Sequence, residues 1–258
     1  TGHGANVVGS LGSGSLVQDM PTAYSNPSGG DAWVNVGTDT ALELSGATAT
    51  VSCWVKSIYD NTSFADNNHA VSKYQGGTAK RGYRLGINND GGGSMYWAVG
   101  LPGAGGSVQA TQDVSTYGLD TTEWFHMAGT FDAGVMKLYI NGDLATEEDH
   151  SASTVEVSGN ATVPFEIGAY EVGSRLWYGN MRDVRIWNSS LDITDIQEVF
   201  GDVNMAGATA TGSLQGWWKM ENESLTDSST NSNNGAQSGT AVWDKSEYNL
   251  NQIGSGSV

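Results

Sequence analysis

The segment covering residues 178–196 constrains the fold more than any other part of the chain. Its first half has the pattern of a strand that stops at a polar turn, and its second half restarts as a short helix. Asp192 is placed as the helix N-cap, Asp195 favours the positive end of the helix dipole, and Gly201 can end the helix. Because the rest of the chain carries almost no helix signal, we predict a β protein with one short helix near residues 193–200.

Short strand-like runs recur elsewhere, with turn-forming residues between them. They occupy residues 49–55, 124–131, 135–140 and 163–168. Asn141-Gly142 follows the third run, and this dipeptide favours a tight β-hairpin turn because both residues tolerate positive φ. The pattern predicts an all-β fold built from many short strands.

A single domain can account for most of the 258 residues, because all-β sandwiches often reach this length. Residues 1–15 are rich in Gly and Ser and lack periodicity, so we expect a flexible arm there. We place one domain at residues 16–248 and a tail at residues 249–258. The chain starts with Thr1 and shows no signal peptide, so we expect a processed mature form.

The net charge of −17, from 11 basic and 28 acidic residues, narrows the possible partners. A chain so poor in Lys and Arg is not expected to bind nucleic acid or an anionic membrane surface. No apolar run approaches the length of about 20 residues that a membrane span needs, so we expect no membrane insertion. Cations in the surroundings would relieve the repulsion among the acidic residues; the alternative is that the acidic excess only keeps the chain soluble. The single cysteine, Cys53, excludes an intramolecular disulfide and is expected in the core.

Five motifs occur in a fixed order between residues 30 and 245. They are Ser52-Cys53-Trp54-Val55-Lys56, Val71-Ser72-Lys73 with Gly82-Tyr83-Arg84-Leu85, residues 124–142, residues 179–192 and residues 216–235. Through these motifs the chain resembles the laminin-G-like, concanavalin A-like jelly-roll domains that are common in bacterial and viral extracellular proteins. The resemblance implies an all-β fold, a two-sheet antiparallel jelly-roll sandwich.

The C-terminal segment, residues 213–245, departs from the usual order of the resembling domains. In many of them the Trp-rich segment with the Asp-Ser-Ser turn precedes the first strand, whereas here it follows the predicted helix. We expect the segment to fold back and complete its own sandwich. The alternative is pairing with the edge of a neighbouring subunit, since a free edge strand is a template for another chain.

A structural Ca²⁺ ion is the cofactor that the resemblance implies. Its expected ligands are Asp183, Asp227, Asn231, Asn233 and Gly235. Ca²⁺ takes hard oxygens from carboxylates, amides and backbone carbonyls, and the turn after Asp227 offers several. Arg182 stands where the family has an acidic residue, which removes one possible ligand. The alternative is that Asp183 pairs with Arg185 or Arg182 and that Asp227 only makes an Asx-turn.

Catalytic activity is not expected. Resembling domains that cleave glucans carry two Glu and one Asp on one strand face, which places an acid and a nucleophile in one groove. This sequence has no such array. Its closest acidic run, residues 147–149, lacks the alternation that would put carboxylates on one face.

Aromatic residues are the best candidates for ligand contacts, because sugar-binding modules stack rings on Trp or Tyr. The candidates that lie near loop-flanked segments are Tyr96, Trp97, Tyr170 and Trp177. The alternative is that these four side chains also belong to the core.

These observations predict a noncatalytic binding or adhesion module located outside the cell, on a cell surface or on a virion. The resemblance implies that the partner is a glycan or a host-surface polysaccharide. One alternative is a structural or decoration protein that contacts other subunits of a virion or surface assembly. A second alternative is an accessory module of a polysaccharide-degrading enzyme.

Overall fold

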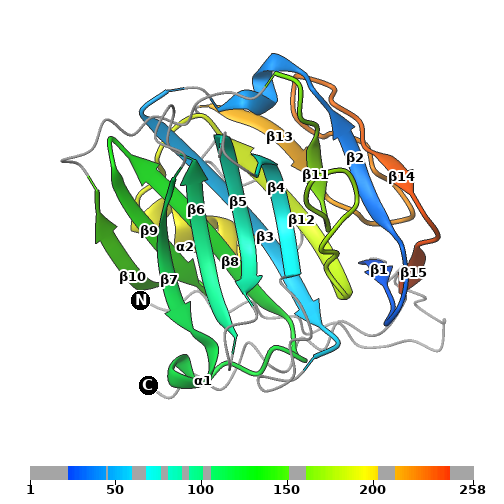
Figure 1. Cartoon of the computed structure of the whole chain (residues 1–258), viewed down its shortest axis with the longest axis horizontal. Helices are drawn as coiled ribbons and strands as arrows, with labels where there is room; N and C mark the ends of the chain where they lie inside the picture. Colours follow the sequence, from blue (N-terminus) through cyan, green and yellow to red (C-terminus); the bar gives the residue numbers. More distant parts are fainter. Residues whose placement is uncertain are drawn as a thin grey trace, which may run out of the picture.

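The computed structural model describes residues 23–44, 46–59, 68–76, 81–88, 93–100, 106–150, 161–202 and 213–244. In these residues the chain forms two antiparallel sheets that lie face to face, with two short α-helices and one 3-10 helix (Figure 1). This architecture confirms the predicted two-sheet jelly-roll sandwich. None of the helices in this part of the chain has the length and apolar composition needed to cross a bilayer.

Sheet A has eight strands, of which seven follow one path. In spatial order they are β10 (Asp143–Asp149), β9 (Val135–Ile140), β8 (Phe125–Asp132), β3 (Thr48–Ser57), β12 (Gly179–Trp187), β1 (Ala23–Asn26) and β15 (Val242–Asp244). The eighth strand, β13 (Leu214–Trp218), pairs with β12.

Sheet B has seven strands. In spatial order they are β14 (Ala236–Ser238), β2 (Trp33–Gly37), β11 (Phe165–Ile167), β4 (Asn68–Gln75), β5 (Arg81–Asn88), β6 (Ser94–Gly100) and β7 (Ser107–Asp113). The 3-10 helix η1 (Thr40–Glu43) follows β2, and α1 (Val114–Tyr117) follows β7.

The main core lies between the sheets, where alternate residues of each strand point inward. Trp97 on β6 is fully buried and touches the backbone of β8, where a Cβ atom at Gly129 would lie 2.4 Å from its ring. Trp218 on β13 stacks on Phe165 of β11, with 5.0 Å between the ring centroids. These large rings join strands of both sheets into one core.

Helix α2 (Ile193–Gly201) covers part of the outer face of sheet A and confirms the predicted helix. Asp192 caps it as expected, because its side chain accepts hydrogen bonds from the backbone N–H groups of Thr194 and Asp195. Ile196 and Val199 on its apolar face are buried in a second, smaller core on β8, β9 and β12. Local capping and an apolar stripe therefore decide both the start and the orientation of this helix.

The C-terminal segment adds strands to both sheets of its own chain. β13 pairs with β12 and β15 with β1 in sheet A, and β14 pairs with β2 in sheet B. Tyr24 and Trp243 make an edge-to-face contact at 5.5 Å between β1 and β15. The predicted arm, residues 1–15, and the predicted tail, residues 249–258, lie outside the described residues, as do both predicted domain limits.

Candidate functional site

The predicted calcium ligand Asp183 lies at a bulge of β12. The bulge falls between Arg182 and Arg185 in the pairing with β3, and Asp183 has a positive φ of 50°. Its carboxylate accepts hydrogen bonds from Arg185 Nε at 2.7 Å and Arg185 Nη2 at 3.0 Å. Arg185 also donates to Asp202 at 2.8 Å. Burial raises the pKa of Asp183, whereas the Arg185 guanidinium lowers it.

Trp217 on β13 connects Asp183 to the second predicted ligand, Asp227. Its indole Nε1 donates to Asp183 Oδ1 at 2.7 Å, and its backbone N–H donates to Asp227 Oδ1 at 2.9 Å. Asp227 also accepts from the backbone N–H and the hydroxyl of Ser229, each at 2.8 Å. The backbone N–H of Asn233 donates to Asp227 Oδ2 at 2.8 Å. Asp227 therefore closes the polar turn that follows it.

The remaining predicted ligands make hydrogen bonds within this turn or to the strands beside it. Asn231 donates from its amide to the carbonyl of Gln215, and the carbonyl of Asn233 accepts from the Trp218 indole. The backbone N–H of Gly235 donates to the carbonyl of Leu225 at 2.8 Å. The three residues thus fix the shape of the turn.

These contacts do not fit a Ca²⁺ ion bridging Asp183 and Asp227. Protein donors reach both oxygens of each carboxylate, and the Arg185 guanidinium already supplies a positive charge beside Asp183. In the part of the chain that the structure describes, no three His, Cys, Asp or Glu side chains are grouped as metal ligands. The predicted alternative, in which Asp183 pairs with Arg185 and Asp227 closes an Asx-turn, is present in the structure. Calcium binding itself stays a prediction.

Two of the predicted ligand-contact residues lie in the core instead. Trp97 is fully buried and its indole donates to the carbonyl of Thr130 at 3.0 Å. Trp177 is 1% exposed and its indole donates to the carbonyl of Lys56 at 3.3 Å. Neither ring can stack on a sugar in this structure, because each is enclosed by its neighbours. The prediction of a contact role for these two residues is corrected accordingly.

Tyr96 and Tyr170 are also buried, at 0% and 5% exposure, so the prediction that their rings contact a ligand is corrected too; they lie in a cluster on the outer face of sheet B. Tyr96 precedes Trp97 on β6 and therefore points to the opposite face. The guanidinium of Arg84 on β5 lies 5.2 Å from the Tyr96 ring, 5.8 Å from Tyr170 and 4.8 Å from Tyr74 on β4. We call these residues, with Arg175, the arginine–tyrosine cluster. The sequence prediction missed Tyr74 and both arginines.

Tyr170 holds the cluster together from a turn that crosses the outer face of β4. Its backbone exchanges two hydrogen bonds with Ser174, and its ring stacks on His69 of β4 at 4.7 Å. The guanidinium of Arg175 lies 5.5 Å from the same ring. Burial and the nearby Glu171 raise the pKa of the Tyr170 hydroxyl to about 12, so the ring is neutral at physiological pH.

The two arginines of the cluster have no carboxylate partner in the part of the chain that the structure describes. Within the described residues, no Asp or Glu oxygen lies within 4.0 Å of either guanidinium, and Arg84 Nε makes no hydrogen bond. Arg175 is exposed and Arg84 is half-buried. Gln109 and Thr111 on β7 are exposed at the same face. The rings of Tyr74, Tyr96 and Tyr170 are buried, at 2%, 0% and 5% exposure, so the arrangement can accept an anionic group through its arginines and not through ring stacking.

A buried carboxyl, Glu166 on β11, lies on the same face of sheet B. One of its oxygens accepts a hydrogen bond from the backbone N–H of Gly173 at 3.1 Å, and the other has no partner. Burial raises the pKa of Glu166 to about 7, against the hydrogen bonds from Gly173 and Val172. The group is a proton-binding site near neutral pH.

Comparisons with known proteins agree with this architecture. Residues 28–197 match the family described as the concanavalin A-like lectin/glucanases superfamily. No protein among the curated sequences matches the chain.

Solved structures also resemble the chain. A "putative carbohydrate binding protein" from Bacteroides ovatus ATCC 8483 has 20% sequence identity and a TM-score of 0.60, and the match covers 86% of this chain and 59% of that one. Two other structures are more distant. The receptor binding domain of botulinum neurotoxin mosaic serotype C/D has 23% identity and a TM-score of 0.48, with coverage of 61% and 37%. A heptameric SAP-like pentraxin from Limulus polyphemus has 13% identity and a TM-score of 0.44, with coverage of 72% and 78%.

Proposed function

Because the chain belongs to the concanavalin A-like lectin/glucanases superfamily, we propose that it is a noncatalytic binding module whose ligand is a carbohydrate. The superfamily name covers both lectins and glucanases, so membership alone leaves binding and catalysis open. The name of the Bacteroides ovatus protein supports the carbohydrate part of the proposal. The sequence supports the noncatalytic part, because it lacks the Glu and Asp array of the resembling glucanases.

The arginine–tyrosine cluster carries this proposal. In a chain of net charge −17, two guanidinium groups that have no carboxylate partner among the described residues flank one tyrosine ring on an outer sheet face. A sugar that bears a carboxylate would supply a partner for Arg84 or Arg175. We therefore propose an acidic glycan, of the kind present in surface polysaccharides, as the ligand. The proposal places the chain outside the cell.

Glycan-array binding followed by calorimetry tests the proposal. We expect binding to oligosaccharides that contain uronic or sialic acid, and little binding to their neutral counterparts. Arg175→Gln should weaken the affinity about tenfold, the usual cost of one charge-assisted hydrogen bond. Raising the salt concentration should also weaken it.

Lys56→Gln is the matched control, because it removes one positive charge from β3 in the other sheet. Its affinity should stay close to that of the unmodified chain. The absence of binding to every acidic glycan, or an equal loss in both variants, would contradict the proposed site.

A further inference from the structure

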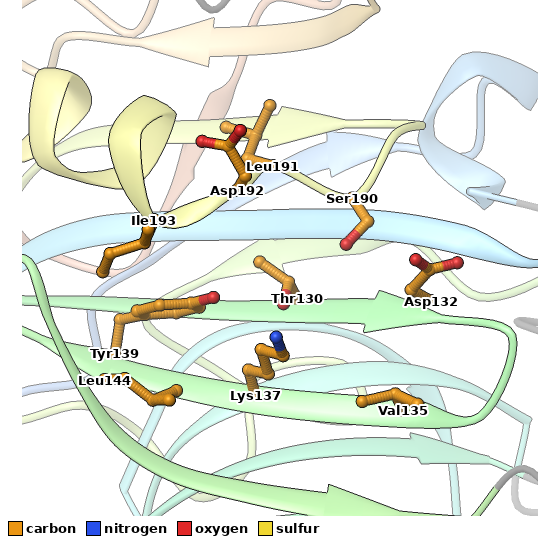
Figure 2. A pocket seen from close by; sticks show the side chains of 10 residues that line it. All are labelled: Thr130, Asp132, Val135, Lys137, Tyr139, Leu144, Ser190, Leu191, Asp192 and Ile193. Atoms are coloured by element: carbon orange, nitrogen blue, oxygen red, sulfur yellow. The ribbon is translucent and has the colours of Figure 1, made fainter.

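A groove of about 600 Å³ opens on the outer face of sheet A, away from the arginine–tyrosine cluster (Figure 2). Its floor is formed by β8 and β9, and β10 closes one side. The chain that leads from β12 into α2 closes the other side. The volume lies within the range of about 300–1,000 Å³ that is typical of small-ligand sites.

Polar groups converge in the middle of this groove. Figure 2 shows the side chains of Lys137 and Ser190 pointing toward Thr130 from opposite sides. Tyr139 lies beside them, and its hydroxyl shares a hydrogen bond with Thr130. Asp132 lines the same space, and its side-chain carboxylate makes no hydrogen bond or ion pair within 4.0 Å with any described residue. The floor therefore offers both hydrogen-bond donors and a free carboxylate acceptor.

Two exposed apolar side chains form the rim on opposite sides of the floor. Leu144 on β10 is 47% exposed and Ile193 on α2 is 41% exposed. They flank Tyr139 in the close-up view (Figure 2). These side chains are available to contact the apolar face of a ligand that enters the groove. The groove thus presents apolar edges above a hydrogen-bonding floor.

The charges in the groove disfavour an anionic ligand. Asp132 and Asp192 both line it, while the ammonium group of Lys137 is paired with Glu147 at 3.2 Å. Asp192 uses one carboxylate oxygen to cap α2. Because Glu147 already pairs with Lys137, an anionic ligand would lie near the carboxylates of Asp132 and Asp192. The hydroxyl groups of an uncharged ligand can donate to these carboxylates and accept from Lys137.

We propose that this groove is a second ligand site, which binds an uncharged sugar ring. The hydroxyl groups of this ring hydrogen-bond to Asp132, Lys137 and Ser190, and the C–H face of a second ring linked to it packs between Leu144 and Ile193 at the other end of the groove. This site is separate from the proposed acidic-glycan site, because it lies on the outer face of the other sheet. It also has the opposite charge preference.

Amide-resolved NMR titration of the full chain tests the inference. The probes are glucose, galactose and mannose, together with glucuronic and galacturonic acid. We expect at least one neutral sugar to shift the resonances of Thr130, Lys137 and Ser190 in a saturable manner. The uronic acids should shift these resonances less, because the groove carboxylates repel them. The inference fails if no neutral sugar perturbs the groove, or if the uronic acids bind there more tightly.

Matched variants separate this site from general charge effects. Asp132→Asn should weaken neutral-sugar binding about tenfold, because it removes a charged acceptor. Asp143→Asn removes another exposed carboxylate, on β10, that does not line the groove, and it should leave binding unchanged. Ile193→Ser should weaken the binding of a neutral disaccharide, whose second ring contacts the apolar rim. Equal losses in Asp132→Asn and Asp143→Asn would overturn the assignment.

The same titration distinguishes failure here from failure of the acidic-glycan proposal. Arg175→Gln should leave the groove titration unchanged, and Asp132→Asn should leave acidic-glycan binding intact. If Arg175→Gln abolishes the resonance shifts that neutral sugars cause, these sugars bind at the arginine–tyrosine cluster, and the groove is not a ligand site.

Discussion

At the residue scale, Asp183 anchors a buried ion pair. Asp183→Ala removes the acceptor of two Arg185 hydrogen bonds and leaves that guanidinium with Asp202 as its remaining carboxylate. Breaking a buried pair from one side costs about 3–5 kcal/mol, and the remaining partner reduces this cost. We expect the free energy of unfolding to fall by about 2–3 kcal/mol in urea denaturation, with an unchanged m-value.

The exposed pair between Lys137 and Glu147 provides the control. Glu147→Ala removes an ion pair whose side chains are 37% and 48% exposed. Solvent screens such pairs, so the free energy of unfolding should change by less than about 1 kcal/mol. A cost in Asp183→Ala no larger than in this control would show that the buried pair is not a stabilising contact.

Glu166 makes the stability depend on pH above the acidic range. Its folded-state pKa is raised to about 7 by burial, whereas in the unfolded chain it titrates near its ordinary value. Between these two values the folded state binds more protons, so this contribution to stability is complete at low pH and is lost as pH rises through about 7. Glu166→Gln removes this loss of stability, because glutamine does not ionise. The variant should gain on the order of 1–3 kcal/mol relative to the unmodified chain between pH 4 and pH 8.

His126 makes the free energy of unfolding change with pH in the opposite direction. The measurement is therefore the difference in this free energy between Glu166→Gln and the unmodified chain at each pH. Burial, together with the charge of Arg185, lowers the pKa of His126 to about 3. Its contribution to stability is present above the unfolded-state pKa and is lost as pH falls. Because both chains contain His126, its effect cancels in the difference. A difference that does not vary with pH would mean that Glu166 titrates normally in the folded state.

At the element scale, the three strands of residues 213–244 complete both sheets. They pair with β12, β1 and β2, and no other described strand takes their places beside these three. A chain ending at residue 212 loses β13, β14 and β15, together with the buried ring of Trp218. Removing one such ring alone costs about 3–5 kcal/mol. We expect the truncated chain to lose its near-ultraviolet circular dichroism and its cooperative thermal transition.

A chain ending at residue 248, the predicted end of the domain, is the control and should melt like the full chain. A cooperative transition in the shorter chain would show that the C-terminal segment is an appendage.

Sequence patterns predicted the elements whose signals are local. The capping residue Asp192 and the apolar stripe of α2 lie within a dozen residues of each other, so the helix was predictable. The face that a side chain occupies depends instead on the pairing between distant strands. Tyr96 and Trp97 are adjacent in sequence, yet one lies on the outer face and the other in the core. For the same reason the sequence did not indicate the role of Arg84, whose aromatic neighbours come from three separate segments.

At the scale of the whole molecule, the net charge of −17 opposes the compact state through self-repulsion. Added salt screens this repulsion, so the melting temperature should rise with ionic strength. A gain of about 1 kcal/mol would raise the melting temperature of a chain of this size by about 2–4 °C. If NaCl leaves the melting temperature unchanged or lowers it, charge repulsion is not a significant cost of folding.

The same melting experiment tests calcium against simple screening. Protein donors already occupy the carboxylates of Asp183 and Asp227, so we expect CaCl₂ and MgCl₂ to raise the melting temperature equally at matched ionic strength. EDTA should leave the melting temperature unchanged, because no bound ion would be removed. Asp183→Asn keeps the shape of the side chain and serves as the specific test. A saturable increase with Ca²⁺ alone that disappears in this variant would establish the calcium site and show that the Asp183–Arg185 pair opens to admit the ion.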